Sequence, residues 1–108
     1  MKSIAIQGII GSNHHIAAQR FYKTNIQLHE CLSFDALVDC LITKKSDEAI
    51  MALENTIAGS IIPNYALIDQ HNLHVSGEYY LPIHHHLMAL PHQQLRDITE
   101  VRSHPMAL

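Results

Sequence analysis

The sequence predicts an α/β fold built around a parallel sheet, and three observations lead to this prediction. Strand-like and helix-like segments alternate in the order βαβαβα. Residues 49–53 form a continuous apolar run, which is typical of a central parallel strand. Residues 34–42 carry apolar side chains at spacings of three and one, which is a clear helical stripe. A sheet of this kind is expected to have right-handed crossovers.

The first half of the chain contains two predicted strand–helix units. Residues 4–7 form a short apolar strand, and glycines at positions 8 and 11 mark the turn that follows it. Apolar spacing predicts a helix over residues 12–22 and a second strand over residues 25–31. Ser33 is placed as the N-cap of helix 34–42, and the third strand covers residues 48–53.

The second half begins with a loop over residues 54–59 and a helix from about Ser60, in which Pro63 lies in the first turn. Residues 73–90 then alternate with period two, which predicts strands, with a bend or an edge at a proline. A last strand is predicted over residues 98–101.

Composition limits the function classes. Hydrophobic residues make up 47% of 108 residues, which fits one globular domain, and the net charge of −3 argues against a nucleic-acid partner. No apolar window approaches a membrane span, and no signal peptide is evident. Cys31 and Cys40 lack the C-x-x-C spacing, so we expect neither a disulfide framework nor a cysteine zinc site, and a reducing cytoplasm is the default.

Three predicted helix starts could hold an anion, because free backbone N–H groups and the helix dipole favour negative charge there. They contain Gly11 with Ser12, Gly59 with Ser60, and Ser103 with His104. Ordinary helix capping is the alternative for each of them. Glu54 either is a solvated loop carboxylate or orients Asn55 by hydrogen bonding.

The histidine-rich stretches do not make a convincing metal site. In the run 84–86, His84 and His86 would share one face of a strand, and no carboxylate or cysteine lies nearby to complete a ligand set. Motifs for dinucleotides, P-loops and serine nucleophiles are also missing from the sequence.

Taken together, the motifs resemble those of the prephenate dehydratase family. Residues 5–12 are similar to the family's first strand and its Gly-Pro-x-Gly-Thr loop, with Ile9 in place of Pro and Ser12 in place of Thr. Residues 53–60 resemble the Ile-Glu-Asn-Ser-x-x-Gly-Ser signature, with Thr56 in place of Ser. Residues 77–85 resemble a strand that crosses between lobes, and residues 103–105 match a Ser-His-Pro motif.

The resemblance implies a two-lobed fold like that of type II periplasmic binding proteins, cut short after the start of the second lobe. Residues 1–71 would be the main part of the first lobe, and residues 72–108 the crossing strands and the start of the second. The family's Thr-Arg-Asp/Phe motif, with its proton-donating threonine, and its regulatory domain would lie outside this chain.

The implied reaction converts prephenate to phenylpyruvate, water and carbon dioxide in phenylalanine biosynthesis, without a cofactor. By resemblance, the catalytic residues are Glu54, Asn55 and Thr56. The implied substrate-binding residues are Gly11, Ser12, Gly59, Ser60, Ser103 and His104. The 108-residue chain alone is expected to be inactive, and a non-catalytic carboxylate-binding module or an inactive remnant is the rival interpretation. Apolar residues after position 72 predict a homodimer, with exchange of a segment between the two chains as one form of it.

Overall fold

The computed structural model describes residues 1–23, 25–56, 59–83 and 87–102. Its centre is a parallel sheet with strand order β2-β1-β3, formed by β1 (Lys2–Gln7), β2 (Ile26–Cys31) and β3 (Glu48–Ala49). The predicted α/β class with a parallel sheet is therefore confirmed.

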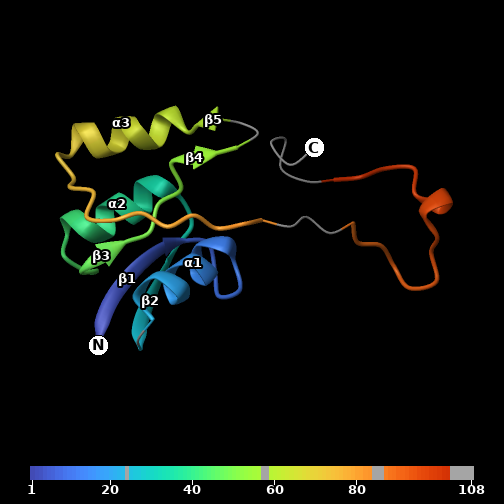
Figure 1. The fold of residues 1–108 in the computed structure, drawn as a ribbon, viewed down its shortest axis with the longest axis horizontal. Coiled ribbons are helices and arrows are strands. Elements are labelled where there is room, and N and C mark those ends of the chain that lie inside the picture. The colour runs from blue at the N-terminus through green and yellow to red at the C-terminus, as the bar shows by residue number, and fades with distance from the viewer. Residues whose placement is uncertain (24, 57–58, 84–86, 103–108) are drawn as a thin grey trace.

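The sheet is covered by a helix on each face, α1 (Asn13–Tyr22) and α2 (Phe34–Ile42) (Figure 1). Alternation along β1 sends its side chains to both layers. Ile4 and Ile6 pack with Ala18 of α1, whereas Ala5 packs with the α2 side. The buried residues of that second cluster are Ala5, Cys31, Leu37, Val38 and Cys40.

The first two helices begin where the sequence places them. The Ser12 hydroxyl caps α1 by accepting the His15 N–H at 3.2 Å, and the Ser33 hydroxyl caps α2 by accepting the Ala36 N–H at 3.1 Å. These side chains satisfy backbone donors that a helix start leaves free.

The third helix, α3 (Ile62–Gln70), begins later than predicted. Its N-cap is Ile61, which makes no side-chain cap, and Pro63 lies in the first turn as expected. The Ser60 hydroxyl does not cap the helix because it donates to Glu54 instead. The helix packs against the α2 layer through Leu67.

The strand predicted over residues 48–53 is shorter than expected. After β3, the Ile50 N–H makes one more bond to the Ala5 carbonyl at 3.0 Å. The Ala52 and Leu53 carbonyls then accept hydrogen bonds from Asn64 and Ile61, so this segment leaves β1 for α3. The predicted loop contains a short antiparallel pair, β4 (Glu54–Asn55) and β5 (Gly59–Ser60).

The strands predicted over residues 73–90 and 98–101 are wrong for the described residues, which have no strand after Ser60. A 3₁₀ turn, η1 (Leu95–Asp97), is the regular element in this part. Alternation alone does not make a strand, because a strand also needs a neighbour for its backbone hydrogen bonds. Residues 73–79 run along the compact part, where the backbone at Gly77 passes close to the Phe21 ring.

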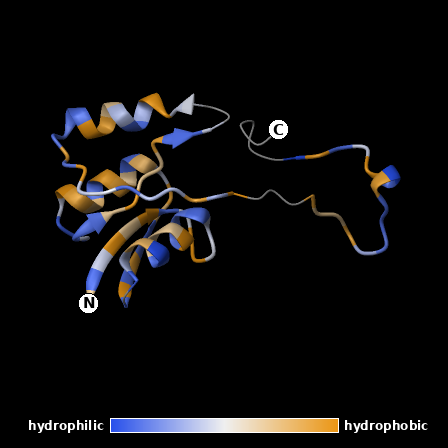
Figure 2. Cartoon of the chain, viewed as in Figure 1, coloured by the Kyte–Doolittle hydropathy of each residue, from blue (hydrophilic) through white to orange (hydrophobic). Residues whose placement is uncertain are grey.

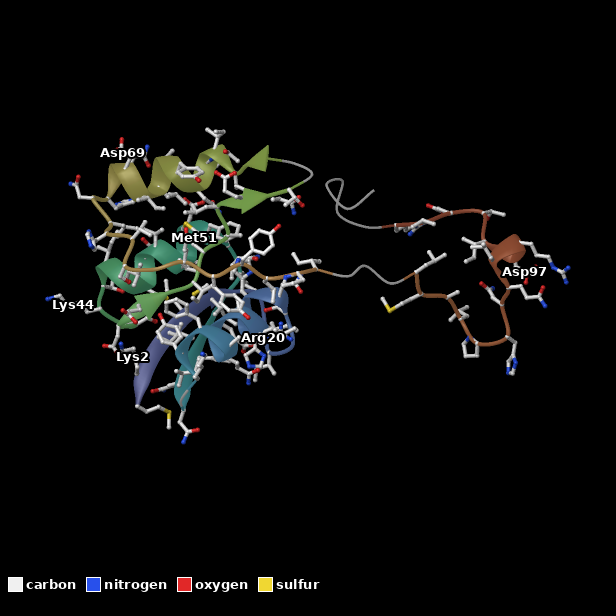
Figure 3. All side chains as sticks on the ribbon, in the orientation of Figure 1. Lys2, Arg20, Lys44, Met51, Asp69 and Asp97 are labelled. Carbon is white, nitrogen blue, oxygen red and sulfur yellow. The ribbon has the colours of Figure 1, made fainter. Side chains whose placement is uncertain are left out.

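Residues 87–102 extend away from the compact part as an arm (Figure 1). Apolar positions continue along it (Figure 2), and the Met88 side chain is 86% exposed. In Figure 3, side chains crowd around Met51 in the compact part, whereas those near Asp97 on the arm have no layer packed against them. The radius of gyration is accordingly 16.3 Å, compared with about 13 Å for a compact domain of this length.

Candidate functional site

The loop after β1 has the backbone conformation that its glycines suggest. Gly8 has φ 108° and Gly11 has φ 94°, a left-handed region that glycine adopts without steric cost. The Gly8 N–H donates to the Cys31 carbonyl at 2.8 Å, which fixes the loop over the end of β2. The loop therefore leads from the carboxyl end of β1 directly into α1.

Side chains of this chain already use the donors of that loop. The Ile10 N–H donates to Glu30 Oε2 at 2.8 Å, and the Gly11 N–H donates to His15 Nδ1 at 2.8 Å. The Ser12 hydroxyl accepts from the His15 backbone as the helix cap. An anion at this loop would thus compete with a carboxylate on β2 and with an imidazole that must be neutral to accept a hydrogen bond.

The β4–β5 hairpin brings together four of the predicted site residues. Glu54 lies opposite Ser60, and Asn55 lies opposite Gly59, whose φ is 80°. Thr56 follows directly and is exposed. The hairpin concentrates the signature residues at the end of the segment that continues from β3.

The Glu54 carboxylate is held by two hydroxyl groups. Ser60 Oγ lies 3.0 Å from Oε1 and 3.1 Å from Oε2, and the Tyr65 hydroxyl donates to Oε1. The hydrogen bond to Glu54 raises the pKa of the Tyr65 phenol, because the proton it donates is retained more strongly. Of the two interpretations of Glu54, the structure therefore favours an ordered carboxylate over a freely solvated one.

The backbone before Glu54 is fixed from the same direction. Asn64, which is 2% exposed, donates from Nδ2 to the Ala52 carbonyl at 2.8 Å. The Ile61 N–H donates to the Leu53 carbonyl at 2.8 Å. Sequence reasoning missed the contributions of Asn64 and Tyr65. The signal that could have found them is an amide and a phenol side by side in the sequence, four residues after the signature ends.

The predicted residues form two clusters rather than one. Glu54, Asn55, Gly59 and Ser60 share the hairpin, and among the described residues neither Gly11 nor Ser12 has a hydrogen bond to it. The two clusters follow adjacent parallel strands, β1 and β3, and so lie beyond the same edge of the sheet. The predictions at Ser103 and His104 lie outside the described residues.

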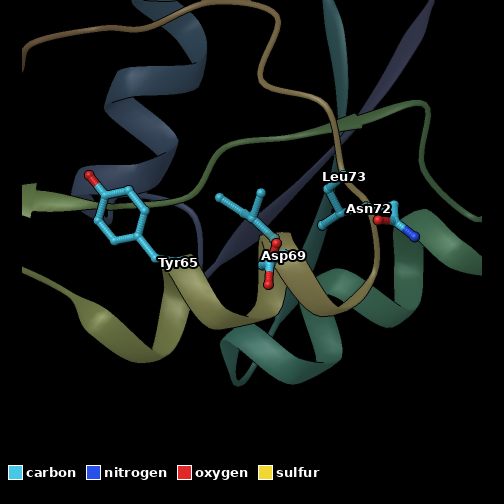
Figure 4. A pocket seen from close by; sticks show the side chains of 5 residues that line it. Tyr65, Asp69, Asn72 and Leu73 are labelled. Atoms are coloured by element: carbon cyan, nitrogen blue, oxygen red, sulfur yellow. The ribbon is translucent and has the colours of Figure 1, made fainter.

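A hollow of about 460 Å³ lies beside α3. In Figure 4, Tyr65 stands at one end of it, with Asn72 and Leu73 toward the other. Ile68 and Asp69 complete the lining, and none of the seven predicted site residues that the structure describes contributes to it. Among the described residues, Tyr65 is therefore the link between this hollow and the candidate site.

Other chemistry-bearing groups lie apart from the hairpin. Cys31 and Cys40 are free and buried, and their sulfur atoms are 3.5 Å apart. Burial raises the pKa of the Cys31 thiol, and the hydrogen bond with Cys40 raises it further. Within the described part of the chain, no three His, Cys, Asp or Glu side chains cluster as metal ligands. The run 84–86 lies outside that part. Also among the described residues, no helix is long and apolar enough to cross a membrane.

Comparison with known proteins identifies the family of this chain. The family described as prephenate dehydratase matches residues 4–108. The chain belongs to the prephenate dehydratase family. Because the match includes the loop after β1 and the β4–β5 hairpin, both clusters lie in the part of the chain that the family shares. No solved structure matches the chain.

Several curated plant proteins are relatives of this chain. It is 39% identical over 105 residues to arogenate dehydratase 5, chloroplastic, of Arabidopsis thaliana and 38% identical to arogenate dehydratase 1 of Petunia hybrida. It is also 38% identical to arogenate dehydratase/prephenate dehydratase 6, chloroplastic, of Arabidopsis thaliana. Each match covers 97% of this chain but only 24–25% of the relative. The chain therefore spans about a quarter of the length of these relatives.

Proposed function

We propose that the protein acts as a prephenate dehydratase in phenylalanine biosynthesis. The observation that carries this proposal is the Glu54–Asn55–Thr56 signature, ordered in a hairpin within a chain of this family. The names of the relatives also make arogenate a substrate to test. Whether prephenate or arogenate is preferred is decided by the same assay, run with both compounds.

In the proposed reaction, the ring hydroxyl of prephenate takes up a proton and leaves as water. The bond to the ring carboxylate breaks, carbon dioxide departs, and its electron pair completes the aromatic ring of phenylpyruvate. Aromatisation drives the reaction, so the protein mainly orients a dianion and delivers one proton. Proton transfer from a positioned acid raises the rate by about 10²–10⁴-fold. No cofactor is required by this proposal.

The residues of the hairpin take different roles in this proposal. Asn55 donates to the substrate, and Thr56 contacts it beside Asn55. Glu54 supports Asn55 rather than reacting, because its carboxylate is engaged by Ser60 and Tyr65. The Ser60 hydroxyl acts through Glu54, and Gly59 leaves the backbone accessible. Gly11, Ser12, Ser103 and His104 remain proposed anion-holding groups.

The direct test measures phenylpyruvate formation by the protein as its gene encodes it. Asn55→Ala should lower kcat/KM by about 10²–10³-fold, the loss expected for one preorganised donor, and Glu54→Gln should have a smaller effect. Asn25→Ala, at an exposed position before β2, is the matched control and should be neutral. Prephenate binding without turnover would instead favour the non-catalytic binding module.

We also propose that residues 1–108 alone do not turn over prephenate, because the relatives are about four times longer than the matched segment. Purified 108-residue chain should form phenylpyruvate no faster than buffer. Turnover comparable to that of the encoded protein would contradict this proposal.

We further propose a two-lobed arrangement in which residues 1–71 form most of one lobe and residues 72–108 begin the second. Support comes from the compact packing through α3 and from the apolar side chains exposed beyond it, such as Tyr80 and Leu90. Burial of that apolar surface in a homodimer, including one with exchanged arms, is the proposed assembly. Light scattering across a concentration series tests it, and a monomer at high concentration would refute it.

The location of the protein stays a prediction. The cytoplasm is proposed from cysteine usage, whereas several relatives have "chloroplastic" in their names. Fractionation of the source cells, with detection of the protein by antibody, distinguishes the two.

A further inference from the structure

We propose that Asn64 and Tyr65 are positioning residues of the dehydratase site. In this proposal they fix Glu54 and the backbone before it, and through that segment they set the orientation of Asn55. The inference rests on the proposed function, since the segment they hold carries the signature residues. Neither residue belongs to that signature.

The two residues are consecutive on the first turn of α3, yet they act on different parts of the same segment. Asn64 points inward and holds the Ala52 carbonyl at 2.8 Å. Tyr65 points outward and its hydroxyl reaches the Glu54 carboxylate. A rigid helix turn thus contacts the segment at residues 52 and 54, just before Asn55.

The segment needs this support because its own secondary structure is minimal. β4 and β5 are two residues each, and they pair only with one another. A hairpin this short is not stable by itself. Its geometry therefore depends on the hydrogen bonds that come from residues 60–65. Those bonds run from Ser60, Ile61, Asn64 and Tyr65 to residues 52–54.

Tyr65 is the residue on which this role can be tested most cleanly. Its phenol makes a charge-assisted bond to Glu54, and Phe removes only the oxygen atom. A misplacement of about 1 Å at a reacting group can cost about 10²-fold in rate. Partial loosening of Glu54 by Tyr65→Phe should cost less than that. We expect a decrease of about 3- to 30-fold in kcat, with KM changed less than about twofold.

The structure offers a matched control with the same chemistry. Tyr22 of α1 lies away from the signature, and burial, followed by the nearby Glu48 carboxylate, raises the pKa of its phenol. Tyr22→Phe therefore also removes one phenol oxygen near a carboxylate and should leave kcat unchanged per folded molecule. Equal losses in the two variants would show that Tyr65 matters only for folding and would overturn the proposal.

A double-mutant cycle separates action through Glu54 from direct action on substrate. In the Glu54→Gln background, Tyr65→Phe should change kcat by less than about twofold, because contacting residues are strongly non-additive. If the two effects instead multiply, Tyr65 does not act through Glu54. Asn64→Asp should reduce kcat in both backgrounds, because Asn64 holds the backbone and not the carboxylate.

A measurement independent of activity completes the test. NMR of tyrosine labelled with ¹³C at Cζ follows the titration of each of the four tyrosines. The Glu54 bond raises the pKa of Tyr65, so Glu54→Gln should lower that pKa and leave the titration of Tyr22 unchanged. An unmoved Tyr65 titration would overturn the proposal even if the enzyme is active. If the Tyr65 titration moves but neither prephenate nor arogenate is turned over, the contact with Glu54 holds but the proposed function fails, and with it the role of Tyr65 in positioning a dehydratase site.

Discussion

Replacement of Asn64 by alanine gives a stability prediction with a magnitude that follows from the structure. The side chain is 2% exposed and its Nδ2 donates to the half-buried Ala52 carbonyl at 2.8 Å. Removing the donor leaves that acceptor without its partner, which costs about 1–3 kcal/mol. At about 2.1 cal/mol/K per residue, 108 residues have an unfolding entropy of about 0.23 kcal/mol/K. The expected fall in Tm is therefore about 4–13 °C.

Aspartate at the same position makes the prediction sharper. Asn64→Asp replaces the amide donor by a carboxylate oxygen that faces a carbonyl oxygen, so it should destabilise the fold at neutral pH more than Asn64→Ala does. Burial without a donor raises the pKa of the new carboxyl above its unfolded value near 3.9. Stability relative to Asn64→Ala should be regained as pH falls, because the protonated acid can donate to Ala52.

Thermal and urea unfolding of the unsubstituted chain and the two Asn64 variants measures both effects. Gln70→Ala, which removes an exposed amide side chain from the same helix, is the matched control and should shift Tm by less than about 2 °C. The reasoning is refuted if Asn64→Ala unfolds within about 1 °C of the unsubstituted chain. It is also refuted if the Asp and Ala variants differ by the same amount at every pH.

Three further outcomes are expected. Ser12→Ala should lower stability by about 1 kcal/mol through loss of the α1 cap, visible as a lower urea midpoint; an unchanged midpoint would rule the cap out. Burial lowers the pKa of His14, so the unfolded chain takes up its proton first and stability should fall as pH drops below about 6.5. The slope should flatten in His14→Phe. Burial raises the pKa of Cys31, so stability should fall as pH rises above about 8.5, and iodoacetamide at pH 8 should label Cys31 slowly unless urea is added. Prompt labelling of the folded chain would contradict this.

The elements that could be predicted from sequence are those specified by local contacts. The cap at Ser33 directly precedes the stripe over residues 34–42, and both agree with the structure. Pairing of strands is not local in this way. Residues 73–90 have the alternation of a strand, but no neighbouring strand pairs with them in the described part of the chain, and the periodicity of a segment contains no information about its neighbours.

The hairpin shows the same limit at the level of single side chains. The signature identified Glu54 but left open whether its carboxylate was solvated or orienting. The deciding partner, Tyr65, has a ring that fits the apolar spacing of the third helix, so the sequence pattern gives no reason to single out its hydroxyl. Apolar spacing shows which side chains share one face of a helix, but it does not show which group a phenol oxygen at the end of a ring will contact. For Tyr65, that contact depends on how α3 packs against its neighbours.

The loop after β1 extends this argument to electrostatics. Glycines and a helix start indicate backbone donors, and the prediction of an anion site at Gly11 and Ser12 used only that. The structure adds an acceptor from β2, the Glu30 carboxylate at 2.8 Å from the Ile10 nitrogen, and a second acceptor in His15. Substrate carboxylate bound here would have to replace the Glu30 contact and approach a like charge. The same constraint applies at the hairpin, because the Ser60 and Tyr65 hydroxyls already donate to the Glu54 carboxylate. In both clusters, donors that the sequence offers to an anion are therefore held by a carboxylate of this chain, and the sequence motif alone does not show that pairing.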